Sequence, residues 1–271
     1  MEKYDCKPTL NDQQVMDFCR NGFMVLPSVV SEDINERTRE FMAEHADSLE
    51  PVEILREDWF DQGVIKNPQA AGAVRSLLGR DFLLPNLISS HRTVGPTPPQ
   101  DWHPDAGSII THRLDYLQVF YYPSGATQEM GPTEVVPGTH MGAARHAMLG
   151  RIKSLKISKL TTSPPGSIFL TVYSVLHRRS NSTYTGIRDN LKYNYWRTTE
   201  PRRDWAYDPE FNFSWQKSMG RPMFGEDQAK MFAWLCGEDW EPMGGQTWPC
   251  FTATVQEDDQ MGLPAGLRRN R

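Results

Sequence analysis

The amino-acid sequence predicts a mainly β protein, an antiparallel barrel or jelly roll with helices flanking it on the N-terminal side. Up to about Leu78, apolar residues recur at the spacing of amphipathic helices. Beyond that point the apolar segments are short, β-branched or aromatic, and Pro, Gly and Ser separate them. Such a series of short strands is typical of an antiparallel sheet that closes on itself.

The helices are predicted from their ends as much as from their apolar faces. Cap-type residues precede each helical pattern, and a glycine or a change of pattern ends it. We expect helices over residues 10–22, from Ser31 to about His45, and from about Asn67 to Leu78.

The strands are predicted from short runs that turn residues interrupt. The expected strands are Phe23 to Leu26, Phe82 to Arg92, Asp115 to Tyr122, Glu134 to Val136, Ile168 to Val172 and Leu191 to Trp196. A chain of 271 residues fits one large domain of this kind.

The domain is expected to cover residues 1–255. Its last part, from about 201 to 255, is a Trp-rich extension with one helix at about Glu226 to Cys236. Residues 256–271 have little apolar content and are expected to form a mobile tail.

Composition narrows the range of partners. A net charge of −5 provides no basic field that would attract nucleic acid or an anionic membrane, and no apolar run is long enough to span a bilayer. The four cysteines show no regular framework, which favours reduced thiols and a cytoplasmic location. We expect a small-molecule partner, and the sequence leaves monomer and homodimer both open.

His103 and Asp105 are the residues best suited to begin a metal-binding site. Residues two apart on a strand point to the same face, so this imidazole and this carboxylate can reach one cation. His177 is the best candidate for a third ligand, and two histidines with one carboxylate form the facial triad of non-haem Fe(II) oxygenases. Beside this pair, Gly107 is expected to permit close backbone approach.

His140 is the alternative third ligand, although it follows turn-forming residues at a strand end. His91, His112 and His146 are expected to be supporting, surface or core residues rather than metal ligands.

Four sequence blocks resemble the phytanoyl-CoA dioxygenase (PhyH) family of Fe(II)- and 2-oxoglutarate-dependent oxygenases. They occur in the family's order and span about residues 10 to 197. The blocks are Gln13-Gln14-Val15 with Asn21-Gly22-Phe23-Met24-Val25-Leu26-Pro27, then Gln100-Asp101-Trp102-His103-Pro104-Asp105, then Glu129 to His140, and finally His177 with Ser180-Asn181-Ser182 and Arg188. Met130 and Thr139 depart from the family pattern at turn positions, and the segment beyond Arg197 has no counterpart.

The resemblance implies a double-stranded β-helix (jelly-roll, cupin-like) barrel in which His103, Asp105 and His177 hold iron. It also implies that Arg188 receives the distal carboxylate of 2-oxoglutarate, for which the rigid guanidinium fork is well suited. Gln100 and Thr133 match positions that contact this cosubstrate in several family members.

The activity implied is that of a non-haem iron dioxygenase. Such an enzyme uses O₂ and 2-oxoglutarate to oxidise an unactivated C–H bond of a small metabolite, most often by hydroxylation, and releases succinate and CO₂. Related halogenases replace the carboxylate ligand with a small residue, so Asp105 favours hydroxylation, desaturation or ring formation. Two alternatives are a cupin-like metalloenzyme that does not use 2-oxoglutarate and a non-catalytic binding protein on the same fold.

Alternate residues of barrel strands point inward, which makes several aromatic residues candidates for the substrate cavity. Core packing is the competing interpretation for each of Trp102, Tyr121, Tyr193 and Trp196. Arg92 and His91 precede the iron block and are candidates to meet an anionic substrate, or else form a solvated strand end. Arg178 and Arg179 are expected to be surface charges.

Overall fold

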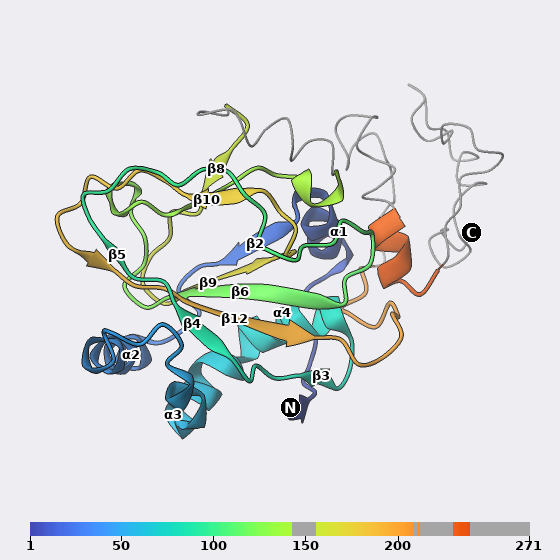
Figure 1. Cartoon of the computed structure of the whole chain (residues 1–271). Coiled ribbons are helices and arrows are strands. Elements are labelled where there is room, and N and C mark those ends of the chain that lie inside the picture. The colour runs from blue at the N-terminus through green and yellow to red at the C-terminus, as the bar shows by residue number, and fades with distance from the viewer. Residues whose placement is uncertain (143–155, 209–210, 212–229, 239–271) are drawn as a thin grey trace.

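Antiparallel strands form the centre of the molecule in the computed structural model, which describes residues 1–142, 156–208, 211 and 230–238 (Figure 1). The strands are β1 (Lys3–Tyr4), β2 (Phe23–Leu26), β3 (Phe82–Leu83), β4 (Ile88–Ser90), β5 (Thr93–Val94), β6 (Tyr116–Tyr122), β7 (Thr133–Val135), β8 (Lys159–Leu160), β9 (Ser167–Thr171), β10 (His177–Arg179), β11 (Ile187–Arg188) and β12 (Leu191–Trp196). The longer helices are α1 (Asp12–Asn21), α2 (Glu32–Glu44) and α4 (Pro68–Leu78). Short helical turns are η1 (Val52–Arg56), α3 (Asp58–Phe60), η2 (Asp61–Ile65), η3 (Gln128–Met130) and η4 (Thr139–Met141).

The largest sheet has the strand order β1-β3-β12-β6-β9-β2 within the described residues, and β4 also pairs with β12. Strands β6 and β12 lie at its centre with Asn194 opposite Gln118 and Lys192 opposite Phe120. Helices α2, α3 and α4 cover one face, while β8 and β10 lie on the other (Figure 1). Strand β10 belongs to a smaller sheet of order β10-β7-β8, and β11 pairs with β5. The functional residues described below lie between the large sheet and the smaller ones.

The hydrophobic core lies under the helix-covered face of the large sheet. Leu117, Val119 and Tyr121 alternate along β6 and are at most 1% exposed. The Tyr121 hydroxyl donates to Asn35 Oδ1 of α2 at 2.7 Å, and the hydroxyl of Tyr195 on β12 donates to the Ile65 carbonyl oxygen at 2.7 Å. The hydroxyl groups of these two tyrosines are therefore satisfied while their rings exclude water.

The predicted N-terminal elements are confirmed. Asn11 and Gln14 form a reciprocal capping box at the start of α1, each side chain accepting from the other's backbone N–H at 2.9 Å. Gly22 ends the helix at φ 80°, where a Cβ would also lie 2.4 Å from the His140 ring. Glycine is therefore required there on two independent grounds.

The prediction of one strand from Phe82 to Arg92 was wrong. The run is divided into β3 and β4, which pair with β12 at separate places. Pro85 lies between them and has no N–H for a sheet hydrogen bond. The helical turns over residues 52–65 were not predicted.

The C-terminal predictions fall largely outside the described residues. Residues 230–235 are helical, within the predicted helix at Glu226 to Cys236. Its first residues, 226–229, and the tail 256–271 lie outside the described part of the chain. Among the described residues there is no helix with the length and apolar character needed to cross a membrane.

Candidate metal centre

His103 and His177 lie directly opposite each other on two antiparallel backbone segments. Each residue donates its N–H to the carbonyl oxygen of the other, at 3.0 and 2.9 Å. Opposing residues of an antiparallel pair send their side chains to the same face. The two imidazole rings are accordingly neighbours, with centroids 4.8 Å apart. The backbone thus fixes the spacing of these rings.

Asp105 is the third potential ligand and lies on the same backbone segment as His103. Its Oδ2 atom lies 3.8 Å from Nε2 of His177. The potential ligand atoms of His103, Asp105 and His177 all lie within 4.8 Å of one another. The structure therefore brings together the three residues that the sequence indicated, in a set with the donor types of a facial triad.

Both imidazoles present Nε2 towards the group. Nδ1 of His103 lies 2.7 Å from the Asp101 carbonyl oxygen, and Nδ1 of His177 lies 3.0 Å from that of Val175. A carbonyl oxygen only accepts, so each ring carries its proton on Nδ1 and keeps the Nε2 lone pair for a metal. Burial lowers the pKa of His177 to about 4, which keeps its ring neutral at pH 7.

Lys192 contacts Asp105, the candidate carboxylate ligand. This contact was not predicted from the sequence. The Lys192 Nζ atom lies 2.6 Å from Asp105 Oδ2 and 5.0 Å from the centre of the Phe120 ring. Burial alone would raise the pKa of Asp105, but Lys192 and then His177 outweigh it and hold this pKa below its usual value. The period-two pattern of β12 could have revealed Lys192, because it places Lys192, Asn194 and Trp196 on one face.

Arg188 is a buried cation facing the same cavity as the three candidate ligands. It is 3% exposed, and its guanidinium donates to Thr93 Oγ1 at 3.0 Å and to Asn190 Oδ1 at 3.3 Å. Its Nε has no hydrogen-bond partner, and Arg188 forms no ion pair within the described part of the chain. Burial lowers the pKa of this guanidinium. An unpaired buried charge is costly, so the site is built for an anion.

The remaining predicted cosubstrate residues also line this cavity, whose volume is about 150 Å³. Gln100 accepts the backbone N–H of Arg179 at 3.0 Å through Oε1. Thr133 Oγ1 lies 2.7 Å from the hydroxyl oxygen of Tyr122. Arg92 lines the cavity as well, but its Nε and Nη2 atoms donate to the two oxygens of the Asp189 carboxylate, at 2.8 and 2.9 Å. Arg92 is thus already neutralised.

Trp102 and Tyr121 do not line the cavity. Trp102 follows the strand alternation away from His103 and packs with Val136 and Leu176, with the Arg178 guanidinium 4.3 Å from its ring centre. Tyr121 points to the helix-covered face of the large sheet. Both residues therefore belong to the packed core, which was the competing interpretation.

His140 and Gly107 also differ from the roles considered for them. The His140 ring is fully buried against α1, with Nε2 3.0 Å from the Cys19 carbonyl oxygen, and it is not part of the ligand group. Gly107 has φ 79°, and a Cβ there would meet no atom within 4 Å. The glycine therefore serves the backbone turn rather than close approach.

The prediction of Arg178 and Arg179 as surface charges was wrong, because both are partly buried and line the cavity. Arg179 is two residues from His177 on β10, and its Nη1 is buried without a hydrogen-bond partner among the described residues. Burial and then neighbouring Arg188 lower its pKa. Arg178 also lines the cavity but pairs with Glu134 at 2.7 Å. Of the four arginines that line the cavity, Arg179 and Arg188 have no ion-pair partner among the described residues.

Comparison with known proteins gives structural relatives only. No protein-family model matches the chain, and no curated protein matches it by sequence. HygX from Streptomyces hygroscopicus, solved with nickel and 2-oxoglutarate bound, is similar with a TM-score of 0.57 and 17% identity, over 71% of this chain and 88% of HygX. EctD from S. alaskensis with bound Fe has a TM-score of 0.53 and 17% identity, over 72% of this chain and 80% of EctD. SnoK, a non-heme alpha ketoglutarate dependent carbocyclase from nogalamycin biosynthesis, has a TM-score of 0.54 and 16% identity, over 71% of this chain and 87% of SnoK. At these identities the likeness shows a shared fold.

Proposed function

We propose that this chain is an Fe(II)- and 2-oxoglutarate-dependent dioxygenase with a double-stranded β-helix barrel, of the phytanoyl-CoA dioxygenase type. The proposal is supported by a two-histidine, one-carboxylate group in a cavity that also contains unpaired arginines. It is further supported by similarity in fold to HygX and EctD, which were each solved with iron and with 2-oxoglutarate. The reaction we propose is hydroxylation of an unactivated C–H bond in a small molecule.

The observation that carries the proposal is the buried Arg188 without a carboxylate partner. A metal-binding cavity alone would fit many metalloenzymes. A dicarboxylate that binds a metal at one end requires a cation at the other, and Arg188 offers a planar fork for a bidentate grip. A cupin-like enzyme that does not use 2-oxoglutarate would have no use for a buried cation that must lose its hydration.

Each cavity residue has a distinct part in this function. His103, Asp105 and His177 would hold Fe(II), and the carbonyl contacts at Nδ1 keep both imidazoles oriented for it. With 2-oxoglutarate and O₂, the bound iron supplies the oxidation of the C–H bond, with release of succinate and CO₂. Arg188 would anchor the distal carboxylate, and Thr133 and Gln100 lie on the same cavity wall.

The proposal is tested by an anaerobic titration with Fe(II) followed by 2-oxoglutarate. The native protein is expected to develop the weak visible charge-transfer band of an iron-bound 2-oxoglutarate. His177→Ala should lose the band, whereas His112→Ala, at an exposed histidine, should keep it. Absence of the band in the native protein, or its retention in His177→Ala, would overturn the proposal. Stimulation of succinate release by candidate compounds then identifies the substrate.

A further inference from the structure

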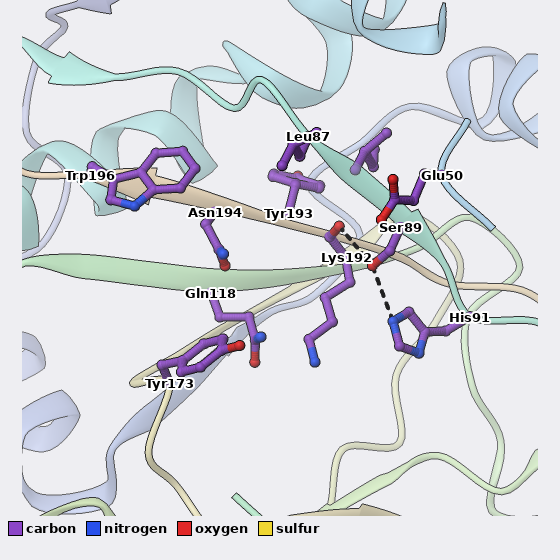
Figure 2. A pocket seen from close by; sticks show the side chains of 11 residues that line it. Glu50, Leu87, Ser89, His91, Gln118, Tyr173, Lys192, Tyr193, Asn194 and Trp196 are labelled. Carbon is purple, nitrogen blue, oxygen red and sulfur yellow. Dashed lines mark hydrogen bonds between the residues drawn. The ribbon is translucent and has the colours of Figure 1, made fainter. Parts of the chain in front are cut away.

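A second cavity of about 230 Å³ lies beside the candidate metal centre. His91 and Lys192 line both cavities, so the two spaces share a wall. Figure 2 shows Lys192 and Asn194 of β12 and Gln118 of β6 extending to the same side of the sheet, with Tyr173 facing them. This face also carries Trp196, which offers an aromatic surface. The second cavity is therefore polar at its centre and aromatic at one end.

Lys192 contacts the Asp105 oxygen that also lies near His177, another candidate ligand. The same oxygen, Oδ2, lies 2.6 Å from Lys192 Nζ and 3.8 Å from His177 Nε2. An ammonium group and a divalent cation repel each other at contact distance, so both cannot hold this oxygen at full strength. A metal ion at the His-Asp-His group would displace the ammonium. The second cavity, which Lys192 already lines, is adjacent.

A displaced Lys192 would need another anion. Its side chain is only 12% exposed, and Asp105 is its single ion-pair partner in the described part of the chain. The ring of Phe120 at 5.0 Å offers a weaker contact. A largely buried ammonium without a counter-ion is costly, and a carboxylate in the second cavity would remove that cost.

The side chains that line this cavity include two with a buried oxygen that has no hydrogen-bond partner among the described residues. Gln118 is 2% exposed and donates to Asp105 through its amide. Because a carboxylate only accepts, this contact turns the NH₂ group towards Asp105 and leaves Oε1 as an acceptor. Neither Gln118 Oε1 nor Asn194 Oδ1 has a partner among the described residues. Exposed Glu50 adds an acidic group on the cavity wall.

We propose that the second cavity binds a small carboxylate that also carries a hydrogen-bond donor, an ammonium or a hydroxyl group. Lys192, released from Asp105 by the metal ion, holds the carboxylate. Gln118 and Asn194 receive the donor group. The inference rests on the proposed function, because it names the substrate class of the same site. Lys192 thus determines specificity, and metal binding prepares it for the substrate.

The first experiment measures the exchange at Asp105 without any turnover. Zn(II) affinity is compared in the metal-free native protein, Lys192→Met, Lys192→Arg and Lys159→Met, using a chelating dye as competitor. Lys192→Met should bind Zn(II) about tenfold more tightly because one desolvated charge no longer competes. Lys192→Arg retains a cation and should stay close to the native protein, as should Lys159→Met at an exposed lysine of β8. Equal or weaker Zn(II) binding by Lys192→Met would overturn the exchange.

The second experiment tests the ligand class by calorimetric titration of the protein loaded with Zn(II) and 2-oxoglutarate. The probes are γ-aminobutyrate, γ-hydroxybutyrate, butyrate without a donor, and γ-aminobutyramide without a carboxylate. A carboxylate with a donor should bind at least about tenfold more tightly than γ-aminobutyramide. Lys192→Met should lose this preference, and Gln118→Leu should lose the preference over butyrate. The amino and hydroxy probes distinguish the two kinds of donor.

Three results would overturn the ligand class: no binding by any probe, equal binding of the amide probe, or an unchanged preference in Lys192→Met. None of them depends on the visible band of iron-bound 2-oxoglutarate. Conversely, absence of that band in the native protein would overturn the proposed function even if γ-aminobutyrate binds. As a further control, the visible band of iron-bound 2-oxoglutarate is titrated in Lys192→Met. If the 2-oxoglutarate concentration needed for the band rose as much as in Arg188→Met, Lys192 would bind the cosubstrate, and this result would overturn the inference.

Discussion

The two faces of β6 and β12 differ in how completely their polar atoms are satisfied. On the face covered by helices, Tyr121 and Tyr195 bury their rings and donate their hydroxyl protons at 2.7 Å, whereas the buried hydroxyl of Tyr193 has no hydrogen-bond partner among the described residues. On the opposite face, Gln118 and Asn194 leave side-chain oxygens without partners, although the strands and their register are the same. One face contributes to stability, whereas the other retains interactions for a ligand.

This difference shows that the cavity face of the sheet contributes less to the stability of the fold than the helix-covered face does. Unpaired buried groups lower stability unless something binds to them, so they persist where binding matters. The contrast predicts that substitutions on the cavity face change ligand binding with little loss of stability. Substitutions on the helix-covered face should do the reverse.

The largest expected effect belongs to Arg188→Met on the cavity side. Loss of the guanidinium should weaken 2-oxoglutarate binding by ~2–5 kcal/mol, the range for removal of one partner from a buried charge pair. The Fe(II) affinity should change far less, and the cofactor-free protein should be as stable as the native one or more so, because an unpaired buried charge has gone. Titration of the visible band and urea unfolding measure the two effects. Arg113→Met, at an arginine whose side chain is 59% exposed, is the control. Equal loss of iron and 2-oxoglutarate binding would contradict the anchor role.

On the helix-covered face, Leu117→Ala should destabilise the protein by ~2–4 kcal/mol through the cavity it leaves. Leu117 is fully buried at the centre of the large sheet. Urea unfolding of the metal-free protein measures this loss, with Leu49→Ala at a 79% exposed position as the control. The charge-transfer band should persist in the folded Leu117→Ala protein. If the band were lost while the protein stayed folded, the helix-covered face would also affect ligand binding, and the contrast between the two faces would be wrong.

Acidification should affect the cavity side through His177. The pKa of this imidazole falls from 6.5 to about 4 on folding, so the unfolded chain binds more protons between these values. The stability of the metal-free protein should therefore decrease as pH falls from about 6.5 to about 4, by at most ~3 kcal/mol from this group. The comparison is between urea unfolding of the native protein and of His177→Gln. A difference in stability between the two that stays constant over this pH range would refute the assignment.

The smallest effect should come from the hydroxyl of Tyr121. Tyr121→Phe leaves Asn35 Oδ1 without this donor and should cost ~1 kcal/mol. Asn194→Leu, a change on the cavity face, should be neutral or slightly stabilising because the Asn194 Oδ1 atom has no partner to lose. Thermal unfolding of both metal-free variants measures the pair. If Asn194→Leu destabilised the protein more than Tyr121→Phe, the contrast between the faces would fail.

Local features of the fold could be predicted from the sequence. The capping box at Asn11 and Gln14 and the positive φ of Gly22 act within one helical turn, so α1 could be located without its surroundings. Pairings between distant segments could not be derived in this way. β10 joins β7 and β8 through contacts that no local pattern encodes, and β3 and β4 were merged because the effect of Pro85 depends on the partner strand.

Prediction of the site had a similar limit. His103 and Asp105 share a face because of their spacing alone, whereas His177 and Arg188 were recognised through family resemblance. Arg179 was missed because adjacent arginines look equivalent in sequence. The alternation of β10 places Arg179 on the face of His177 and turns Arg178 towards Glu134.

The paired hydrogen bonds between His103 and His177 also bear on how the protein folds. They join segments that have β6, β7, β8 and β9 between them in the chain, so their formation closes a long loop and carries an entropic penalty. No short fragment of the chain can contain the metal centre, and the centre is complete only after that loop has closed. A bound ion would therefore hold the segment of His103 and strand β10 together, and losing it should speed local opening at β10 before the helix-covered core unfolds.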